Sequence, residues 1–353
     1  RRGEALNAFE AFKETLEREL GGVPLESTEA LADSLRRAGG ESGAGERVPE
    51  ALPVPGTPFV GREAELASLG EAFAAGARIV TIVGLGGSGK TRLALEVASR
   101  QLQAGEEVAF VPLGGATSEE MAKTLIGESL GLAADAQDAE AVLRKALRDR
   151  QLLLVLDNFE AVLEAGPLVS RLVRAAPRLS VLVTSREALL LEGEWLVDLG
   201  GLDVPSEEGA AKRPEEFGAV RLFMQQAARV APGFAPRPED TEAIVSICRR
   251  LEGLPLAIEL VAGWSRLLAP TQLERQLAED RSLLTSRRRD APARHRSLWD
   301  VFDHSWERLG PDEKRALPLL SIFREGFGLE AAQAVAGTDL KTLLNLLDRK
   351  LVR

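Results

Sequence analysis

Short apolar runs alternate with helical patterns in the first two thirds of this 353-residue chain. The runs are nearly continuous, which is typical of parallel strands that helices cover on both faces. Five strands are predicted in this way, at Ile79–Val83, Val108–Leu113, Leu152–Leu156, Val181–Thr184 and Trp195–Leu199. Thr117, with Glu120 three residues later, predicts a capping box that opens a helix at 118–130, between the second and third strands. The pattern therefore predicts an α/β fold, with a parallel sheet flanked by helices.

Helical periodicity dominates the regions on either side of these strands. A Gly- and Pro-rich stretch separates a short helical segment at the start of the chain from the sheet region. The strand signals end after a polar stretch at 204–218, and helices are expected at about 216–230, 239–251, 255–268 and 271–280. We expect a helical segment at 1–40, a linker at 41–57, the sheet domain at 58–205, a helical lid domain at 206–290 and a last domain at 291–353.

Composition excludes several classes of protein. The formal net charge is -10, which disfavours a non-specific nucleic-acid binder because phosphate neutralisation needs a basic surface. The single cysteine, Cys248, cannot form an intramolecular disulfide and lies on an apolar helical face, so we expect it to be buried. No apolar run approaches the ~18–20 residues of a membrane helix. We expect a cytoplasmic location, no membrane partner, and further domains outside this stretch of chain.

A phosphate-binding loop follows the first strand. Residues 84–91 read GLGGSGKT and match G-x-x-x-x-G-K-[ST] throughout, with an apolar strand before them and a helix after them. The glycines allow successive amides to face an anion, and the positive end of the helix points at the same place. The residues predicted to bind the nucleotide are Gly84, Gly86, Gly87, Ser88, Gly89, Lys90, Thr91 and Arg92.

Three side chains around this loop are predicted to act on the phosphates and a metal. Lys90 supplies a cation for the β and γ phosphates, and the Thr91 hydroxyl is a hard oxygen ligand for Mg²⁺. Asp157 ends the buried strand at 152–156 and is expected to hold the same Mg²⁺ at the carboxyl edge of the sheet. These groups predict a purine nucleoside triphosphate with Mg²⁺ as ligand, without choosing between adenine and guanine.

Two more charged residues are candidates for catalysis. Glu160, with Asn158, is a candidate for orienting or deprotonating the attacking water, although a solvated surface charge explains Glu160 as well. Arg186 follows Thr184 and Ser185 at the end of a strand, where its planar fork suits a γ-phosphate. A strand-end salt bridge is the alternative role for Arg186.

Read together, these residues resemble the STAND class of P-loop NTPases, the NB-ARC-like ATPases related to AAA+ proteins. The likeness is greatest to the ATPase module of AfsR-type bacterial transcriptional regulators and covers about 58–353. Beyond the phosphate loop, it rests on Pro58–Leu66 (PFVGREAEL), Leu152–Glu160, Thr184–Arg186 and Gly253–Ile258 (GLPLAI).

The resemblance implies the base and the roles of four more residues. It implies ATP or ADP with Mg²⁺, with Val60, Gly61 and Arg62 against the adenine and Pro255 over it. Gly253 and Pro255 are explained equally well by a plain corner between two helices, so the adenine contact at Pro255 comes from the resemblance alone. The last domain resembles the start of a winged helix, and 1–40 resembles the end of a TPR-like activator domain.

The resemblance also implies a function, which is a regulatory switch with slow ATP hydrolysis and domain closure around ADP. Transcription would be the output, with DNA bound only through domains outside this chain, in response to an activating ligand that the sequence does not specify. The resemblance allows homo-oligomerisation in the ATP-bound state. A bacterial immune sensor of the same class is the main alternative. An AAA+ DNA-associated ATPase is a less favoured alternative because of the acidic net charge, and a metabolic kinase is the least favoured.

Overall fold

The computed structural model describes residues 52–132, 138–206, 213–279, 281–284, 298–323, 326–349 and 351–352. The helical segment expected at 1–40 and most of the linker expected at 41–57 lie outside the described residues. Within the described part of the chain, no helix is both long enough and apolar enough to cross a bilayer.

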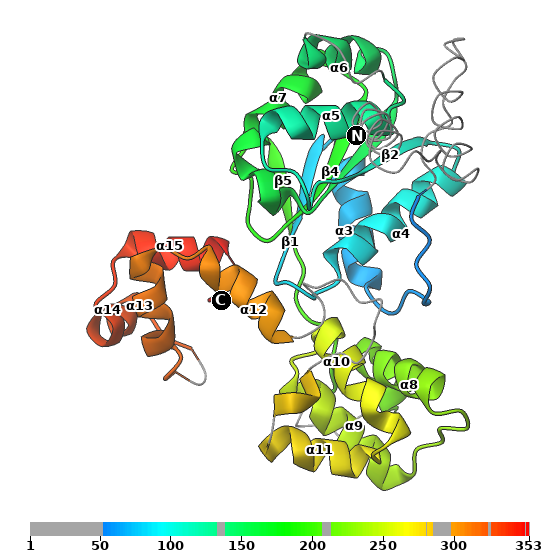
Figure 1. Cartoon of the computed structure of the whole chain (residues 1–353), viewed down its shortest axis with the longest axis vertical. Coiled ribbons are helices and arrows are strands. Elements are labelled where there is room, and N and C mark those ends of the chain that lie inside the picture. Colours follow the sequence, from blue (N-terminus) through cyan, green and yellow to red (C-terminus); the bar gives the residue numbers. More distant parts are fainter. Residues whose placement is uncertain are drawn as a thin grey trace, which may run out of the picture. The chain divides into compact units, whose positions relative to one another are not determined.

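A five-stranded parallel sheet forms the centre of the first part of the described chain (Figure 1). Its strands are β1 (Ile79–Val83), β2 (Glu107–Pro112), β3 (Leu152–Asp157), β4 (Leu179–Ser185) and β5 (Glu194–Asp198). Their order is β2-β3-β4-β1-β5, and all four pairings are parallel. The five predicted strands are confirmed. Since β4 lies between β1 and β3, its carboxyl end stands between the phosphate loop and Asp157.

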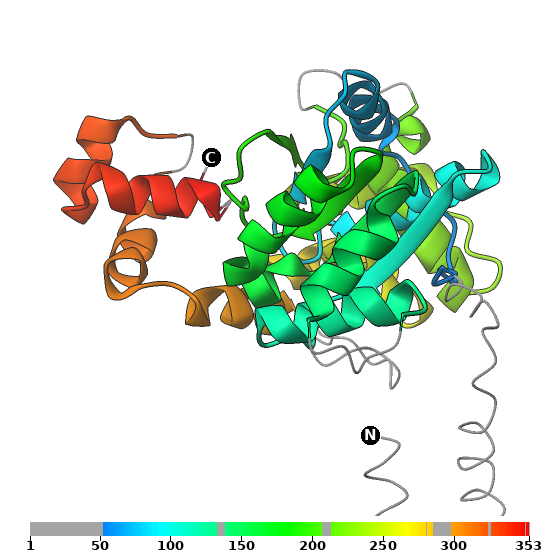
Figure 2. The ribbon, with the colours of Figure 1, turned by 90° about the horizontal axis from the view of Figure 1, so that it is seen from above.

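Helices cover both faces of the sheet, as the continuous apolar strands predicted (Figure 2). On one face, Leu152, Leu154 and Leu156 of β3 pack with α5 (Glu119–Ser129), α6 (Ala139–Leu147) and α7 (Gly166–Ala175). On the other face, Leu153 and Val155 pack with α3 (Glu63–Ala74) and α4 (Lys90–Gln103). Alternate residues of one strand thus enter opposite cores, which explains why the sequence shows no polar face.

The helix predicted from 118 to 130 is present as α5. Its first turn differs from a capping box built on Thr117 and Glu120, because Ser118 is the N-cap and its hydroxyl accepts a hydrogen bond from the Met121 amide at 3.2 Å. Thr117, Ser118 and Glu120 all suit a helix start, and the extended backbone of Ser118 selects it. α3 was not predicted as a helix, although its first residues belong to the segment Pro58–Leu66 on which the family resemblance partly rests.

A second apolar core lies among the helices that follow the sheet, with Phe223, Ile247 and Ile258 fully buried in it. These helices are α8 (Gly218–Val230), α9 (Pro238–Arg250), α10 (Pro255–Ala262) and α11 (Pro270–Glu279). They confirm the four helices predicted here. Cys248 of α9 is buried as expected, and burial raises the pKa of its thiol to about 12.

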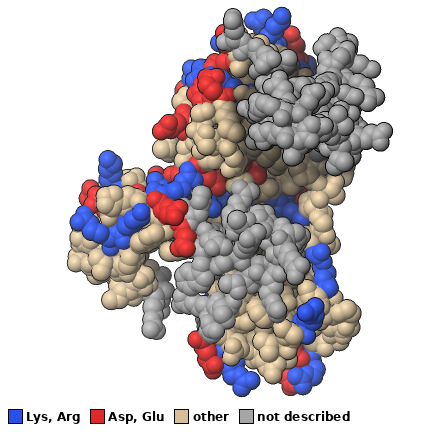
Figure 3. Space-filling view, viewed as in Figure 1, with Lys and Arg blue, Asp and Glu red and all other residues tan. Residues whose placement is uncertain are grey.

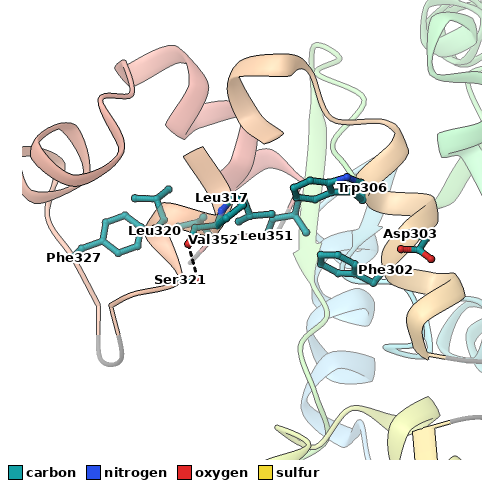
Figure 4. Close-up of a pocket in the computed structure, with 10 residues that line it drawn as sticks. Phe302, Asp303, Trp306, Leu317, Leu320, Ser321, Phe327, Leu351 and Val352 are labelled. Atoms are coloured by element: carbon teal, nitrogen blue, oxygen red, sulfur yellow. Dashed lines mark hydrogen bonds between the residues drawn. The ribbon is translucent and has the colours of Figure 1, made fainter. Parts of the chain in front are cut away.

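The last described helices share a core that includes Leu309, Leu320 and Leu346. They are α12 (Leu298–Glu307), α13 (Pro311–Leu320), α14 (Leu329–Ala336) and α15 (Leu340–Asp348). An apolar hollow of about 670 Å³ lies among them. Figure 4 shows side chains that line it, which include Phe302, Trp306 and Phe327. The residues that line this hollow include none of the predicted nucleotide-binding residues.

Candidate functional site

The loop at 84–91 connects the buried strand β1 to α4, as predicted. Gly87 and Gly89 have φ values of 81° and 95°, in the left-handed region that favours glycine. Gly89 is also the N-cap of α4, so the positive end of this helix opens at the loop. The loop therefore has the backbone and dipole of an anion site.

Lys90 is the buried cation of this loop and is 8% exposed. Its Nζ donates to the carbonyl oxygens of Gly84 at 2.8 Å and Leu85 at 2.9 Å. Burial lowers the pKa of its ammonium to about 8, the Glu160 and Asp157 carboxylates oppose this shift, and Arg186 adds to it. Among the described residues, the hydrogen-bond partners of the ammonium are these two neutral carbonyls, which an anionic phosphate can displace.

Asp157 joins the loop to the neighbouring strand ends. Its Oδ1 accepts hydrogen bonds from the Thr91 hydroxyl at 2.7 Å and from the Thr184 hydroxyl at 2.6 Å. Thr184 in turn accepts from the Asn158 amide at 3.0 Å. The structure therefore brings together the two predicted metal ligands, and it adds Thr184 as the side chain that orients the carboxylate.

Glu160 and Arg186 form an ion pair beside this cluster, with 3.2 Å between Glu160 Oε1 and Arg186 Nε. Glu160 is 4% exposed, so it is not the solvated surface charge that was the alternative. The salt bridge proposed as the alternative role of Arg186 is present. Among the described residues, Glu160 Oε2 is one of the few buried side-chain oxygens without a hydrogen-bond partner. Such an atom can accept a hydrogen bond from a water molecule.

Residues from the C-terminal helices also reach this pair. The Arg186 guanidinium donates to the Ser305 hydroxyl, and Arg308 donates to the Glu160 carbonyl. Neither contact was predicted, because Ser305 and Arg308 carry no recognisable motif and lie more than a hundred positions along the chain.

Two arginines, Arg62 in the segment ahead of the phosphate loop and Arg92 after the loop, make the main polar contacts of that segment. The buried guanidinium of Arg62 donates to carbonyl oxygens of Ser88, Gly200 and Gly201. Arg92, in the first turn of α4, donates to the hydroxyl and carbonyl of Thr57. Gly61 has a φ of 68° and Val60 before it is partly buried. The involvement of Thr57 was not predicted, since a lone threonine in a linker gives no signal.

Pro255 begins α10 and lies close to the loop. A Cβ built on Gly89 would be 4.0 Å from Pro255 Cγ, and the Leu256 amide donates to the Gly87 carbonyl at 3.2 Å. A cavity of about 580 Å³ borders the loop at Leu85 and Gly86 and extends to Leu254. The predicted GLPL segment therefore meets the phosphate loop directly.

Residues 65–192 match the model of the NB-ARC domain. The chain is 32% identical over 289 residues to the uncharacterised protein Mb0918 of Mycobacterium bovis, covering 80% of this chain and 70% of that protein. The chain belongs to the NB-ARC family of P-loop ATPases. This family belongs to the STAND class, which the sequence motifs resemble.

Two longer relatives carry the names of regulators. The chain is 34% identical over 284 residues to Mb0914c of Mycobacterium bovis, a protein predicted to be an HTH-type transcriptional regulator. It is 28% identical over 376 residues to the regulatory protein AfsR of Streptomyces coelicolor. These matches cover 78% and 96% of this chain but only 31% and 35% of the two relatives, so the chain spans about a third of their length.

One solved structure that matches this chain is that of a STAND protein with a tetratricopeptide-repeat sensor from Pyrococcus horikoshii. It is 19% identical, with a TM-score of 0.38, and the match covers 86% of this chain and 41% of that protein. The assignment to the NB-ARC family rests on the sequence matches above.

Proposed function

We propose that this NB-ARC chain is a molecular switch that binds ADP or ATP with Mg²⁺ and hydrolyses ATP slowly. The observation that carries the proposal is the position of the Thr91 hydroxyl and the Asp157 carboxylate, which touch at the mouth of the phosphate loop. A phosphate held by the loop amides and Lys90 would lie beside both oxygens.

The donor set fits Mg²⁺ completed by phosphate and water. Thr91 and Asp157 offer hard oxygen atoms, which this cation prefers. Among the described residues there is no cluster of three His, Cys, Asp or Glu side chains that could hold a metal ion by themselves. A metal that takes few protein ligands and keeps its other positions for phosphate and water suits such a site. When bound, Mg²⁺ supplies charge neutralisation of the phosphates.

Slow hydrolysis is inferred from the side chains around Glu160. Its Oε2 is free to orient a water molecule, but its Oε1 is paired with Arg186. The residue after Asp157 is Asn158 rather than a second acid. Glu160 is therefore the carboxylate that we propose as the general base. Its ion pair with Arg186 must loosen before that arginine can contact a γ-phosphate.

The switch is inferred from contacts between the loop and the helices that follow. Pro255 and Leu256 of α10 meet Gly89 and Gly87, so a change in the loop displaces the start of α10. Arg186 links to Ser305 of α12, where a γ-phosphate would compete for the same guanidinium. We assign 58–205 to the nucleotide domain, 206–290 to a helical lid and 291–353 to the start of a winged helix. ADP would favour their closed arrangement and ATP an open one.

The output is proposed to be control of transcription, by analogy with the two regulators that share this segment. The described part of the face in Figure 3 shows acidic and basic side chains interspersed, which suits a module that leaves DNA binding to domains outside this chain. An activating ligand would shift the balance between the two nucleotide states, and the ATP state would be the one to self-associate.

Small-angle X-ray scattering on the nucleotide-free chain loaded with ADP, or with a non-hydrolysable ATP analogue, tests the switch. The radius of gyration should be larger with the ATP analogue than with ADP, at a protein concentration where both samples are monomeric. Identical scattering from both saturated samples would contradict the switch while leaving nucleotide binding intact.

A further inference from the structure

Arg62 lies where the phosphate loop meets the segment that leads out of the sheet. Its side chain is 6% exposed, and it forms an ion pair of 2.6 Å with Glu65. The same guanidinium donates to the Ser88 carbonyl at 3.1 Å, the Gly200 carbonyl at 2.7 Å and the Gly201 carbonyl at 3.0 Å. The planar fork of arginine suits such divergent acceptors, whereas a lysine is a point charge on a flexible stem.

The contact with Ser88 acts on an amide of the phosphate loop. The Ser88 carbonyl and the Gly89 N–H belong to one planar peptide unit and point in opposite directions, because this bond is trans. A cation that holds the carbonyl therefore fixes the direction of the N–H and also polarises it. Arg62 thus orients a donor of the anion site from behind, without contacting the anion.

The contacts with Gly200 and Gly201 act on the joint between the sheet and α10. The Leu202 amide donates to the Gly253 carbonyl at 2.8 Å. A Cβ on Gly201 would lie 1.8 Å from the Glu252 carbonyl oxygen, and one on Gly253 would lie 2.0 Å from the Leu202 carbonyl oxygen. The two backbone segments are therefore packed directly on each other, and neither can shift alone.

A second link returns from α10 to the loop. The Leu256 amide donates to the Gly87 carbonyl at 3.2 Å, and a Cβ on Gly87 would be 2.8 Å from Leu256 Cβ. A closed ring of contacts thus joins three segments, which are the phosphate loop, 200–202 and 253–256. Arg62 is a charged side chain within this ring.

We propose that Arg62 is a positioning residue that transmits occupancy of the phosphate loop to the 200–202 and 253–256 segments. The inference rests on the proposed nucleotide binding and concerns how that binding reaches α10. When an anion draws the Gly89 N–H inward, the Ser88 carbonyl moves with it, and Arg62 carries the shift to Gly200 and Gly201. The described contacts of its guanidinium are with the Glu65 carboxylate and with the carbonyl oxygens of Ser88, Gly200 and Gly201.

The test compares the whole 353-residue chain with its Arg62→Ala and Arg62→Lys variants. Arg221→Ala is the matched control, since Arg221 also pairs with a glutamate of α3, Glu63, but its side chain is 39% exposed. ADP affinity is measured by calorimetry. Hydrogen exchange at saturating ADP is followed by mass spectrometry in peptides that cover 199–204 and 252–258.

ADP should slow exchange of both peptides in the wild type and in Arg221→Ala. In Arg62→Ala, the Kd for ADP should rise about tenfold or more, because the Gly89 amide is no longer held. At saturating ADP the protection of both peptides should be lost. Arg62→Lys should recover part of the affinity and little of the protection, since one ammonium replaces a fork.

Three results would overturn the role of Arg62. One is unchanged affinity and protection in Arg62→Ala, and another is full protection at saturating ADP despite weaker binding. The third applies if circular dichroism shows that Arg62→Ala is unfolded. The Arg62→Lys variant then decides, and wild-type ADP affinity together with wild-type protection in that variant rejects the proposal. A wild-type chain that binds no ADP would instead reject the proposed function, and the two failures are thus distinct.

Discussion

The hydroxyl of Thr91 and the carboxylate of Asp157 are 66 positions apart in the chain and lie 2.7 Å from each other. The first belongs to the opening turn of α4, and the second ends β3, which is separated from β1 by β4. Thr184 at the end of β4 bridges the gap by donating to the same carboxylate oxygen. The strand between the two motifs is therefore part of the proposed metal site.

Replacing Lys90 by alanine should remove most of the affinity for ADP. A hydrogen bond to a charged group contributes up to about 3 kcal/mol, which corresponds to a roughly 100-fold rise in Kd. Calorimetric titration measures this directly. Lys145→Ala, on the exposed side of α6, is the control and should bind as the wild type does. Equal affinity in the Lys90 variant would contradict the role given to this ammonium.

Replacing Asp157 by asparagine should act on the metal-dependent step. Mg²⁺-dependent ATP hydrolysis should fall by about tenfold or more, because the amide lacks the negative charge that holds the cation. ADP binding in the presence of EDTA should change much less, because the loop and Lys90 remain. Phosphate release and ADP titration on the same sample provide the comparison. An unaltered dependence of hydrolysis on Mg²⁺ concentration would refute this assignment.

Glu160→Gln should slow hydrolysis while preserving nucleotide affinity. General acid–base groups contribute roughly 100- to 10,000-fold to rates, and a loss near the lower end is expected because Glu160 is paired with Arg186. The matched control is Glu164→Gln, an exposed position in the same short segment. Single-turnover hydrolysis on pre-bound ATP separates chemistry from binding. Equal rates in the two variants would exclude Glu160 as the base.

ADP affinity should decline as the pH rises through about 8. The pKa of Lys90 is lowered to about 8 by burial, so the free protein loses this proton above that pH and must regain it to bind phosphate. The Kd should then rise by up to about tenfold per pH unit, and the proton taken up should appear in calorimetry with buffers of different ionisation enthalpy. If the Lys90→Arg variant binds ADP, its affinity should not depend on pH in this range. A wild-type Kd that stays constant across this range would contradict the role given to the Lys90 proton.

The sequence was sufficient for the sheet and the loop because their signals are local. The strands read as continuous apolar runs, and GLGGSGKT carries its chemistry in eight adjacent residues. The start of α5 was placed at Thr117 rather than Ser118 because both residues cap helices, and only the extended backbone at 118 distinguishes them. The strand order was also out of reach, since parallel runs of similar composition do not reveal their neighbours.

Other parts of the candidate site depend on contacts that no local pattern encodes. Ser305 and Arg308 reach Arg186 and Glu160 from the far end of the chain. The hydrogen bonds from the Arg62 guanidinium to carbonyl oxygens of distant loops gave no signal in the sequence either, and the adenine contact that its motif implies stays a prediction. The burial of Glu160 likewise follows from packing in three dimensions.

The most direct test of the central claim is the nucleotide that the purified chain carries or takes up. The protein is denatured, its supernatant is separated by chromatography, and a stripped sample is titrated with ADP. We expect close to one ADP or ATP per chain, or saturable uptake of one ADP that Lys90→Ala strongly weakens. Absence of any bound nucleotide, together with no uptake by a folded stripped sample, would contradict the account.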